Sequence, residues 1–97
     1  MSIVIYEGLK LEVEPEVYKP AEDSFLIAEN LEIKENDKVL ELGTGSGLLS
    51  ILAANKGASR IIATDISDKA LKCARKNTEE TGVEKKINFK KGNLFEP

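Results

Sequence analysis

A glycine-rich turn between an apolar strand and an apolar helix constrains this chain more than any other feature. The turn spans residues 43–47 (GTGSG), after an expected strand at 38–42 and before an expected helix at 48–55. Glycine allows positive φ angles and close approach of a ligand, and amide groups at the helix start then face that ligand. The spacing is G-x-G-x-G, with Leu48 where a dinucleotide fingerprint needs its third glycine or alanine. The turn therefore indicates a ligand site and argues against an NAD-dependent oxidoreductase.

Two acidic residues accompany the turn. Glu41 lies two residues before Gly43, and Asp65 closes a second apolar strand, 18 positions after Gly47. An acid about 20 residues beyond such a turn is typical of a group that binds ribose hydroxyls. Helix capping is a second interpretation of Asp65, although Ser67 and Asp68 are better placed to cap. The combination indicates an adenosine-containing cofactor rather than a tight turn that binds nothing.

The order of expected elements predicts an α/β fold. Residues 3–6 and 9–13 favour a hairpin around Glu7–Gly8, and an irregular connection runs to Pro20. The remaining segments alternate between helical and strand patterns: a helix over 21–31, a buried strand over 38–42 that is apolar on both faces, a helix over 48–55, a strand over 60–64, a helix that begins at Ser67 or Asp68 and ends before Gly82, and a strand over 86–90. This βαβαβ order predicts half of a Rossmann-like, doubly wound parallel sheet.

Composition excludes several kinds of site. The chain has 97 residues, no His, one Cys and a net charge of −3. The absence of His removes His-based triads and His metal ligands, and a single Cys offers neither a disulfide nor a zinc cluster. No metal site is therefore expected. No apolar run approaches the roughly 18 residues of a membrane span, and no signal peptide is apparent, so a cytoplasmic protein without membrane contact is expected.

The motifs resemble those of a known enzyme family. Val39–Gly47 with Asp65 resembles class I S-adenosylmethionine-dependent methyltransferases. Residues 17–26 (VYKPAEDSFL) resemble the N-terminal motif of the HemK family, which methylates a glutamine side-chain nitrogen (N5) in translation release factors. The archaeal and eukaryotic branch is the most similar, because there the motif lies near the N-terminus without a separate helical domain. The resemblance runs from about Tyr18 to Pro97.

The resemblance implies a cofactor pocket for S-adenosyl-L-methionine. Its residues would be Tyr18, Pro20, Ser24, Glu41, Gly43, Gly45, Gly47, Asp65, Asn93 and Leu94. Glu41 and Gly43 would line the methionine end, Asp65 would accept from the ribose diol, and Asn93 with Leu94 would hold the adenine. Ser24 would approach from the N-terminal helix, while Tyr18 and Pro20 would help close the pocket. Packing is the alternative role for Tyr18, and a first-turn helix position is the alternative for Ser24.

The resemblance also shows what these residues lack. The family's Asn-Pro-Pro-Tyr motif, which binds the acceptor amide, matches no residue here, so no catalytic residue is assigned. Residues 1–97 are interpreted as the N-terminal, cofactor-binding part of one methyltransferase domain, with the hairpin and connection in 1–20 and the helix and βαβαβ unit in 21–97. The chain alone is expected to be inactive. Lys38–Leu42 is expected to have an unpaired edge, which predicts that the chain self-associates or needs the remaining half of the domain as a partner.

Alternatives remain open for the substrate and for the class of function. A release factor is the expected protein substrate, and the resemblance implies a small zinc-binding activator protein as a partner. An RNA or DNA adenine N6-methyltransferase is the alternative enzyme, since such enzymes share the missing motif, although nucleic acid is not favoured. A non-enzymatic cofactor-binding fragment or interaction module is the alternative of another class.

Overall fold

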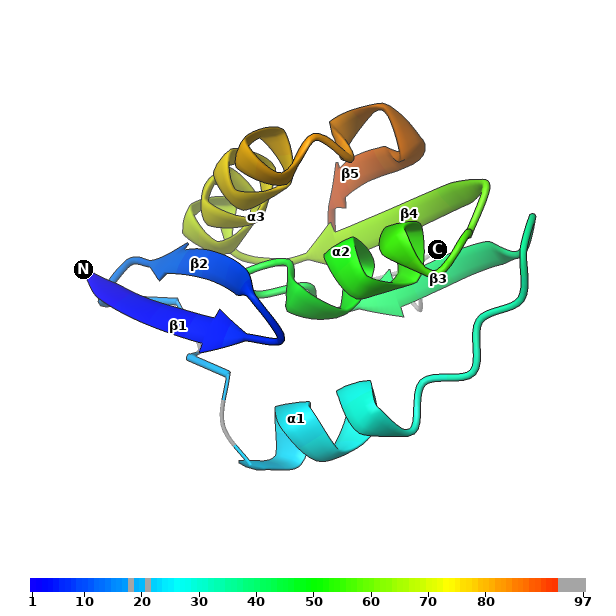
Figure 1. Ribbon diagram of the computed structural model, residues 1–97. Helices are drawn as coiled ribbons and strands as arrows, with labels where there is room; N and C mark the ends of the chain where they lie inside the picture. The colour runs from blue at the N-terminus through cyan, green and yellow to red at the C-terminus, as the bar shows by residue number, and fades with distance from the viewer. Residues whose placement is uncertain (18, 21, 93–97) are drawn as a thin grey trace.

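The computed structural model describes residues 1–17, 19–20 and 22–92. Figure 1 shows its elements in chain order: strands β1 (Ser2–Tyr6) and β2 (Leu9–Val13), helix α1 (Glu22–Glu29), strand β3 (Lys38–Leu42), helix α2 (Leu48–Asn55), strand β4 (Arg60–Asp65), helix α3 (Asp68–Thr81), a short 3-10 helix η1 (Glu84–Lys86) and strand β5 (Ile87–Lys91). Every element expected from the sequence is present. The first helix ends earlier than expected, where the Asn30 side-chain amide donates to the Leu26 carbonyl (2.8 Å).

Two sheets make up the strand content of the described residues. β1 and β2 form the antiparallel hairpin, and β3, β4 and β5 form a parallel sheet in that spatial order. Leu40 is paired with Ile62 across β3 and β4, and Ala63 is paired with Phe89 across β4 and β5. The crossovers are α2 and α3, so the expected Rossmann-like βαβαβ unit is confirmed.

Helix α2 lies between the hairpin and the parallel sheet (Figure 1). On one side, Ala53 and Ala54 pack against Ile61 and Ala63 of β4. On the other side, the apolar residues of α2 join a core with the hairpin and α3: Val4, Leu11, Val13, Val17, Ala28, Leu48, Ile51, Leu52, Ala70 and Cys73. A helix with two packed faces needs apolar residues all round, which explains the composition of 48–55.

The expectation that 38–42 is buried on both faces is wrong. Leu40 is 55% exposed and Leu42 is 47% exposed, whereas Val39 and Glu41 on the opposite face are half-buried. Within the described residues, β3 pairs only with β4 and therefore forms the edge of the sheet, as the expected unpaired edge requires. In the same part of the chain, no helix is long and apolar enough to cross a membrane.

Helix α3 has sequence signals at both ends. The Ser67 hydroxyl caps its start by accepting from the Ala70 N–H (3.2 Å), and Gly82 ends it with a φ of 78°. The same helix packs closely on the glycine turn. Gly47 has a φ of 93°, and a Cβ built there would lie 3.3 Å from both Cα and Cβ of Ala74. Glycine at 47 therefore satisfies two requirements, a left-handed backbone and close contact with α3.

Gly47→Ala should destabilise the fold more than Gly82→Ala. The control at Gly82 has a positive φ with no atom within 4 Å of a built Cβ, so it measures backbone strain alone, about 1–2 kcal/mol. Crowding against Ala74 should add about 1–3 kcal/mol at position 47. Urea unfolding followed by circular dichroism measures both variants. Equal losses would show that the contact with Ala74 relaxes freely.

The open edge of β3 should make the chain self-associate, because its unpaired backbone groups lie beside exposed Leu40 and Leu42. Leu40→Lys should shift the chain towards monomer, since a lysine on an edge strand opposes pairing. Leu26→Lys is the control, because Leu26 is also apolar and exposed but lies on helix α1 and not on a strand edge. Size-exclusion chromatography with light scattering measures the mass. A wild-type monomer at high concentration would contradict the prediction.

Candidate functional site

The glycine turn and Asp65 lie together because β3 and β4 are parallel and adjacent. Each of these features follows the carboxyl end of its strand, where ligands bind in open α/β sheets. An open cleft of about 480 Å³ lies at this edge, within the range of small-molecule sites. Its lining comes from the N-terminal connection, α1, the end of β3, the turn, the start of α2, the end of β4 and the start of α3: Glu16, Val17, Pro20, Ser24, Ile27, Glu41, Leu42, Gly43, Thr44, Gly45, Ser46, Leu48, Leu49, Asp65, Ser67 and Ala70.

The Asp65 carboxylate connects the glycine turn to the start of α3. Its Oδ2 accepts from the Gly45 N–H (3.1 Å), and its Oδ1 accepts from the Ser67 N–H (2.9 Å). The Thr44 N–H donates to the Thr64 carbonyl (2.8 Å), which adds a second link between the turn and β4. Ser67 caps the start of α3, so Asp65 is not needed as the cap of that helix. A carboxylate offers about four lone-pair sites, so each oxygen can still accept from a ligand hydroxyl.

The Glu41 carboxyl lies half-buried in the cleft. Its Oε1 accepts from the Ser50 hydroxyl of α2, and its backbone carbonyl accepts from the Thr64 hydroxyl (3.1 Å). Burial raises the pKa of Glu41, and the nearby Asp65 carboxylate raises it further, while the hydroxyls of Ser50 and Thr44 act in the opposite direction. A poorly hydrated carboxylate of this kind gains most from a ligand that carries positive charge.

The predicted site residues fall into three groups. Pro20, Ser24, Glu41, Gly43, Gly45 and Asp65 line the cleft together. Gly47 is not among the lining residues. It follows the lining residue Ser46 and packs against Ala74 of α3. Tyr18, Asn93 and Leu94 lie outside the described residues. Contact of any of these residues with a cofactor stays a prediction.

Sequence reasoning missed Ser50, which donates to Glu41 from inside an otherwise apolar helix. Its signal was a lone hydroxyl in LLSILAAN, a position that a buried helix fills with a polar group only when a partner is near. The apolar part of the lining, including Ile27, Leu48 and Leu49, was also missed as a site. Those residues carry no signal, because apolar residues in helices are ordinary core residues.

Known proteins resemble the part of this chain that forms the cleft. The family model of ribosomal protein L11 methyltransferase (PrmA) matches residues 23–96. A relative from Methanocaldococcus jannaschii, which carries the name "Putative protein N5-glutamine methyltransferase", is 47% identical over 94 residues. That alignment covers 97% of this chain and 47% of the relative, so the chain spans about half of that protein. The glutamine N5 chemistry in this name agrees with the resemblance of residues 17–26 to the HemK motif.

Two solved structures share the fold at appreciable identity. An RNA methyltransferase from Salinibacter ruber, in complex with S-adenosyl-L-homocysteine, has a TM-score of 0.68 and 33% identity over 84% of this chain and 53% of its own. A ribosomal protein L11 methylase from Lactobacillus delbrueckii subsp. bulgaricus has a TM-score of 0.68 and 31% identity over 86% of this chain and 44% of its own. The chain therefore belongs to the class I S-adenosylmethionine-dependent methyltransferases, in the family of ribosomal protein L11 methyltransferase (PrmA).

Proposed function

We propose that this chain is the S-adenosylmethionine-binding part of a methyltransferase that acts on a glutamine side chain in a protein. The observation that carries the proposal is the cleft in which the Glu41 carboxyl, the glycine turn and the Asp65 carboxylate lie together at the ends of β3 and β4. The 47% identity to a protein named for glutamine N5-methylation supports the acceptor class.

The residues of the cleft fit this cofactor. Its methionine end carries an ammonium and a sulfonium, which suit the buried carboxyl of Glu41. Its ribose carries two hydroxyls, which suit the remaining lone pairs of Asp65. Among the described residues, no atom beyond the chain neighbours of Gly43 lies within 4 Å of a Cβ built there, so these residues leave the space beside this part of the turn unfilled.

When bound, S-adenosylmethionine supplies an electrophilic methyl group. The chain's own residues would bind and orient the cofactor: Glu41 by charge, Asp65 by hydrogen bonds, and Leu42, Leu48 and Leu49 by excluding water from the cleft wall. An amide nitrogen is a weak nucleophile and has to be oriented towards the methyl group. The Asn-Pro-Pro-Tyr motif that orients the acceptor in the HemK family has no match in these residues, so we assign them cofactor binding without methyl transfer.

The same proposal includes the finer expectations from the HemK resemblance. A translation release factor is the proposed substrate, a small zinc-binding activator is the proposed partner, and the cytoplasm is the proposed compartment. Residues 1–97 form one unit in this proposal, the cofactor-binding part of a single domain. An adenine N6-methyltransferase is the second candidate, because the Salinibacter ruber neighbour is an RNA methyltransferase. Incubation of the whole protein with labelled cofactor, a release factor and RNA would show which acceptor gains the methyl group.

Isothermal titration calorimetry should show that the chain binds S-adenosylmethionine in preference to NAD. Asp65→Asn should weaken this binding by about tenfold, because an NH₂ group replaces a charged acceptor that faces two N–H donors. Asp68→Asn is the matched control, since that acid is exposed and pairs with Lys91 at the start of the same helix. Preferential binding of NAD, or equal effects of the two variants, would contradict the assignment.

Binding of S-adenosylmethionine should weaken as the pH falls through the raised pKa of Glu41. The cationic end of the cofactor favours the ionised carboxylate, and burial makes Glu41 take up its proton above its ordinary pKa of 4.5. The free energy of unfolding depends on pH in the opposite direction to cofactor binding. A raised pKa means that the folded state binds the proton more tightly, so this contribution to the free energy of unfolding is full below pH 4.5 and is lost as the pH rises through the folded-state pKa.

Calorimetry and urea unfolding over a pH series check these two trends. Glu41→Gln should bind the cofactor more weakly at neutral pH and should remove the acidic part of both pH dependences. Glu79→Gln is the control, because Glu79 is an exposed acid on α3 outside the cleft lining. A pH profile that Glu41→Gln leaves unchanged would remove Glu41 from the cofactor site.

A further inference from the structure

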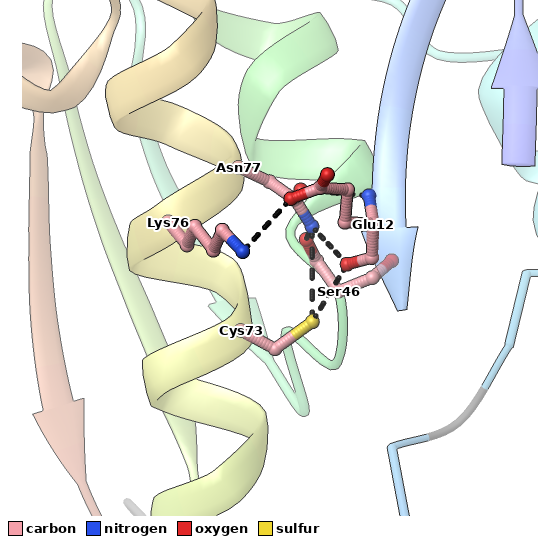
Figure 2. Close-up of polar contacts among 5 residues, drawn as sticks. All are labelled: Glu12, Ser46, Cys73, Lys76 and Asn77. Atoms are coloured by element: carbon pink, nitrogen blue, oxygen red, sulfur yellow. Dashed lines mark hydrogen bonds and ion pairs between the residues drawn. The ribbon is translucent and has the colours of Figure 1, made fainter. Parts of the chain in front are cut away.

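One buried side chain joins three segments that are far apart in the sequence. Asn77 of α3 is fully buried, at 0% exposure. Figure 2 shows its amide between β2 and the glycine turn. Its Oδ1 accepts from the Glu12 N–H (2.9 Å), and its Nδ2 donates to the Glu12 carbonyl (3.0 Å) and to the Ser46 carbonyl (2.8 Å). Two carbonyls and one N–H as partners fix which way the amide points.

The bond to Ser46 acts on the part of the turn that faces the cofactor cleft. Ser46 lines the cleft, and the residues on either side of it are also held. The Gly45 N–H donates to Asp65, and Gly47 lies against Ala74. Three successive residues of the turn are thus held by neighbouring elements, the first by Asp65 of β4 and the other two by α3. Asn77 supplies the bond to Ser46, the middle one of these three residues.

The bonds to Glu12 extend this link to the N-terminal hairpin. Asn77 satisfies both backbone groups of Glu12. Two further contacts hold the hairpin to α3 without touching the turn: the Cys73 thiol donates to the Glu12 carbonyl (3.1 Å), and Lys76 pairs with the Glu12 carboxylate (2.9 Å). Asn77 is therefore the residue of this group that contacts both the hairpin and the turn.

We propose that Asn77 is a positioning residue that holds the glycine turn in the conformation that receives S-adenosylmethionine and couples the hairpin to it. This inference rests on the proposed function. Without the amide donor, the Ser46 carbonyl is buried with one partner fewer, and the turn populates other conformations. Apparent affinity falls in proportion to the fraction of molecules in which the turn is competent.

The test compares Asn77→Ala and Asn77→Asp with two controls on the same helix. Both Asn77 variants remove the donor to Ser46. Lys76→Met removes the ion pair to Glu12, a hairpin contact, and leaves the Asn77 amide and the turn in place. Thr78→Val removes a fully buried hydroxyl that bonds the Arg75 carbonyl within α3. All four variants are measured at a temperature where circular dichroism shows them fully folded, so a loss of stability does not itself change the measured affinity.

Calorimetry should show about fivefold to tenfold weaker binding of S-adenosylmethionine for both Asn77 variants and no change for either control. Amide hydrogen exchange, measured without cofactor, should be faster at residues 45–47 in the Asn77 variants and unchanged there in the controls. Unchanged affinity and exchange in the Asn77 variants would overturn the inference, as would equal effects in Lys76→Met. If the wild type binds no cofactor, the proposed function fails, and exchange at 45–47 still decides whether Asn77 holds the turn.

Discussion

The bond between the Asp65 carboxylate and the Gly45 N–H is the constraint on which the site depends. Because Asp65 also accepts from the Ser67 N–H, one side chain fixes the glycine turn to β4 and to the start of α3 at once. Adjacent parallel strands make this geometry available, since they bring the ends of β3 and β4 to one edge. A turn held in this way is ordered before a ligand arrives, which lowers the entropic cost of binding.

The charges around this bond select among nucleotide cofactors. Glu41 and Asp65 place two carboxylates in one partly apolar cleft, and their proximity contributes to the raised pKa of Glu41. A cationic ligand relieves this repulsion, whereas the anionic pyrophosphate of a dinucleotide would increase it. The charges of Glu41 and Asp65 therefore disfavour a dinucleotide. The G-x-G-x-G spacing disfavours one independently, because the third glycine or alanine of a dinucleotide fingerprint is missing.

The sequence predicted the parts of the structure whose chemistry is encoded locally. Glycine spacing and the strand-terminal acid placed the turn and Asp65, and Ser67 with Gly82 bounded α3. The prediction that Leu40 and Leu42 are buried was wrong, because an apolar strand has the same sequence pattern in the interior of a sheet and at its edge. The role of Asn77 could not be predicted, because its partners lie 31 and 65 positions away in the sequence and helical periodicity does not report them.

The contacts that hold the cofactor turn are separate from the open side of the sheet. Asp65, Ala74 and Asn77 fix the turn, and the hairpin and α2 complete the core on that side. Leu40 projects from the other face of β3 and is not among the residues that line the cleft or hold the turn. A partner covering that face would therefore leave the bonds at the turn in place. This separation gives a physical reason to treat cofactor binding as a property of these residues and acceptor recognition as one of the whole protein.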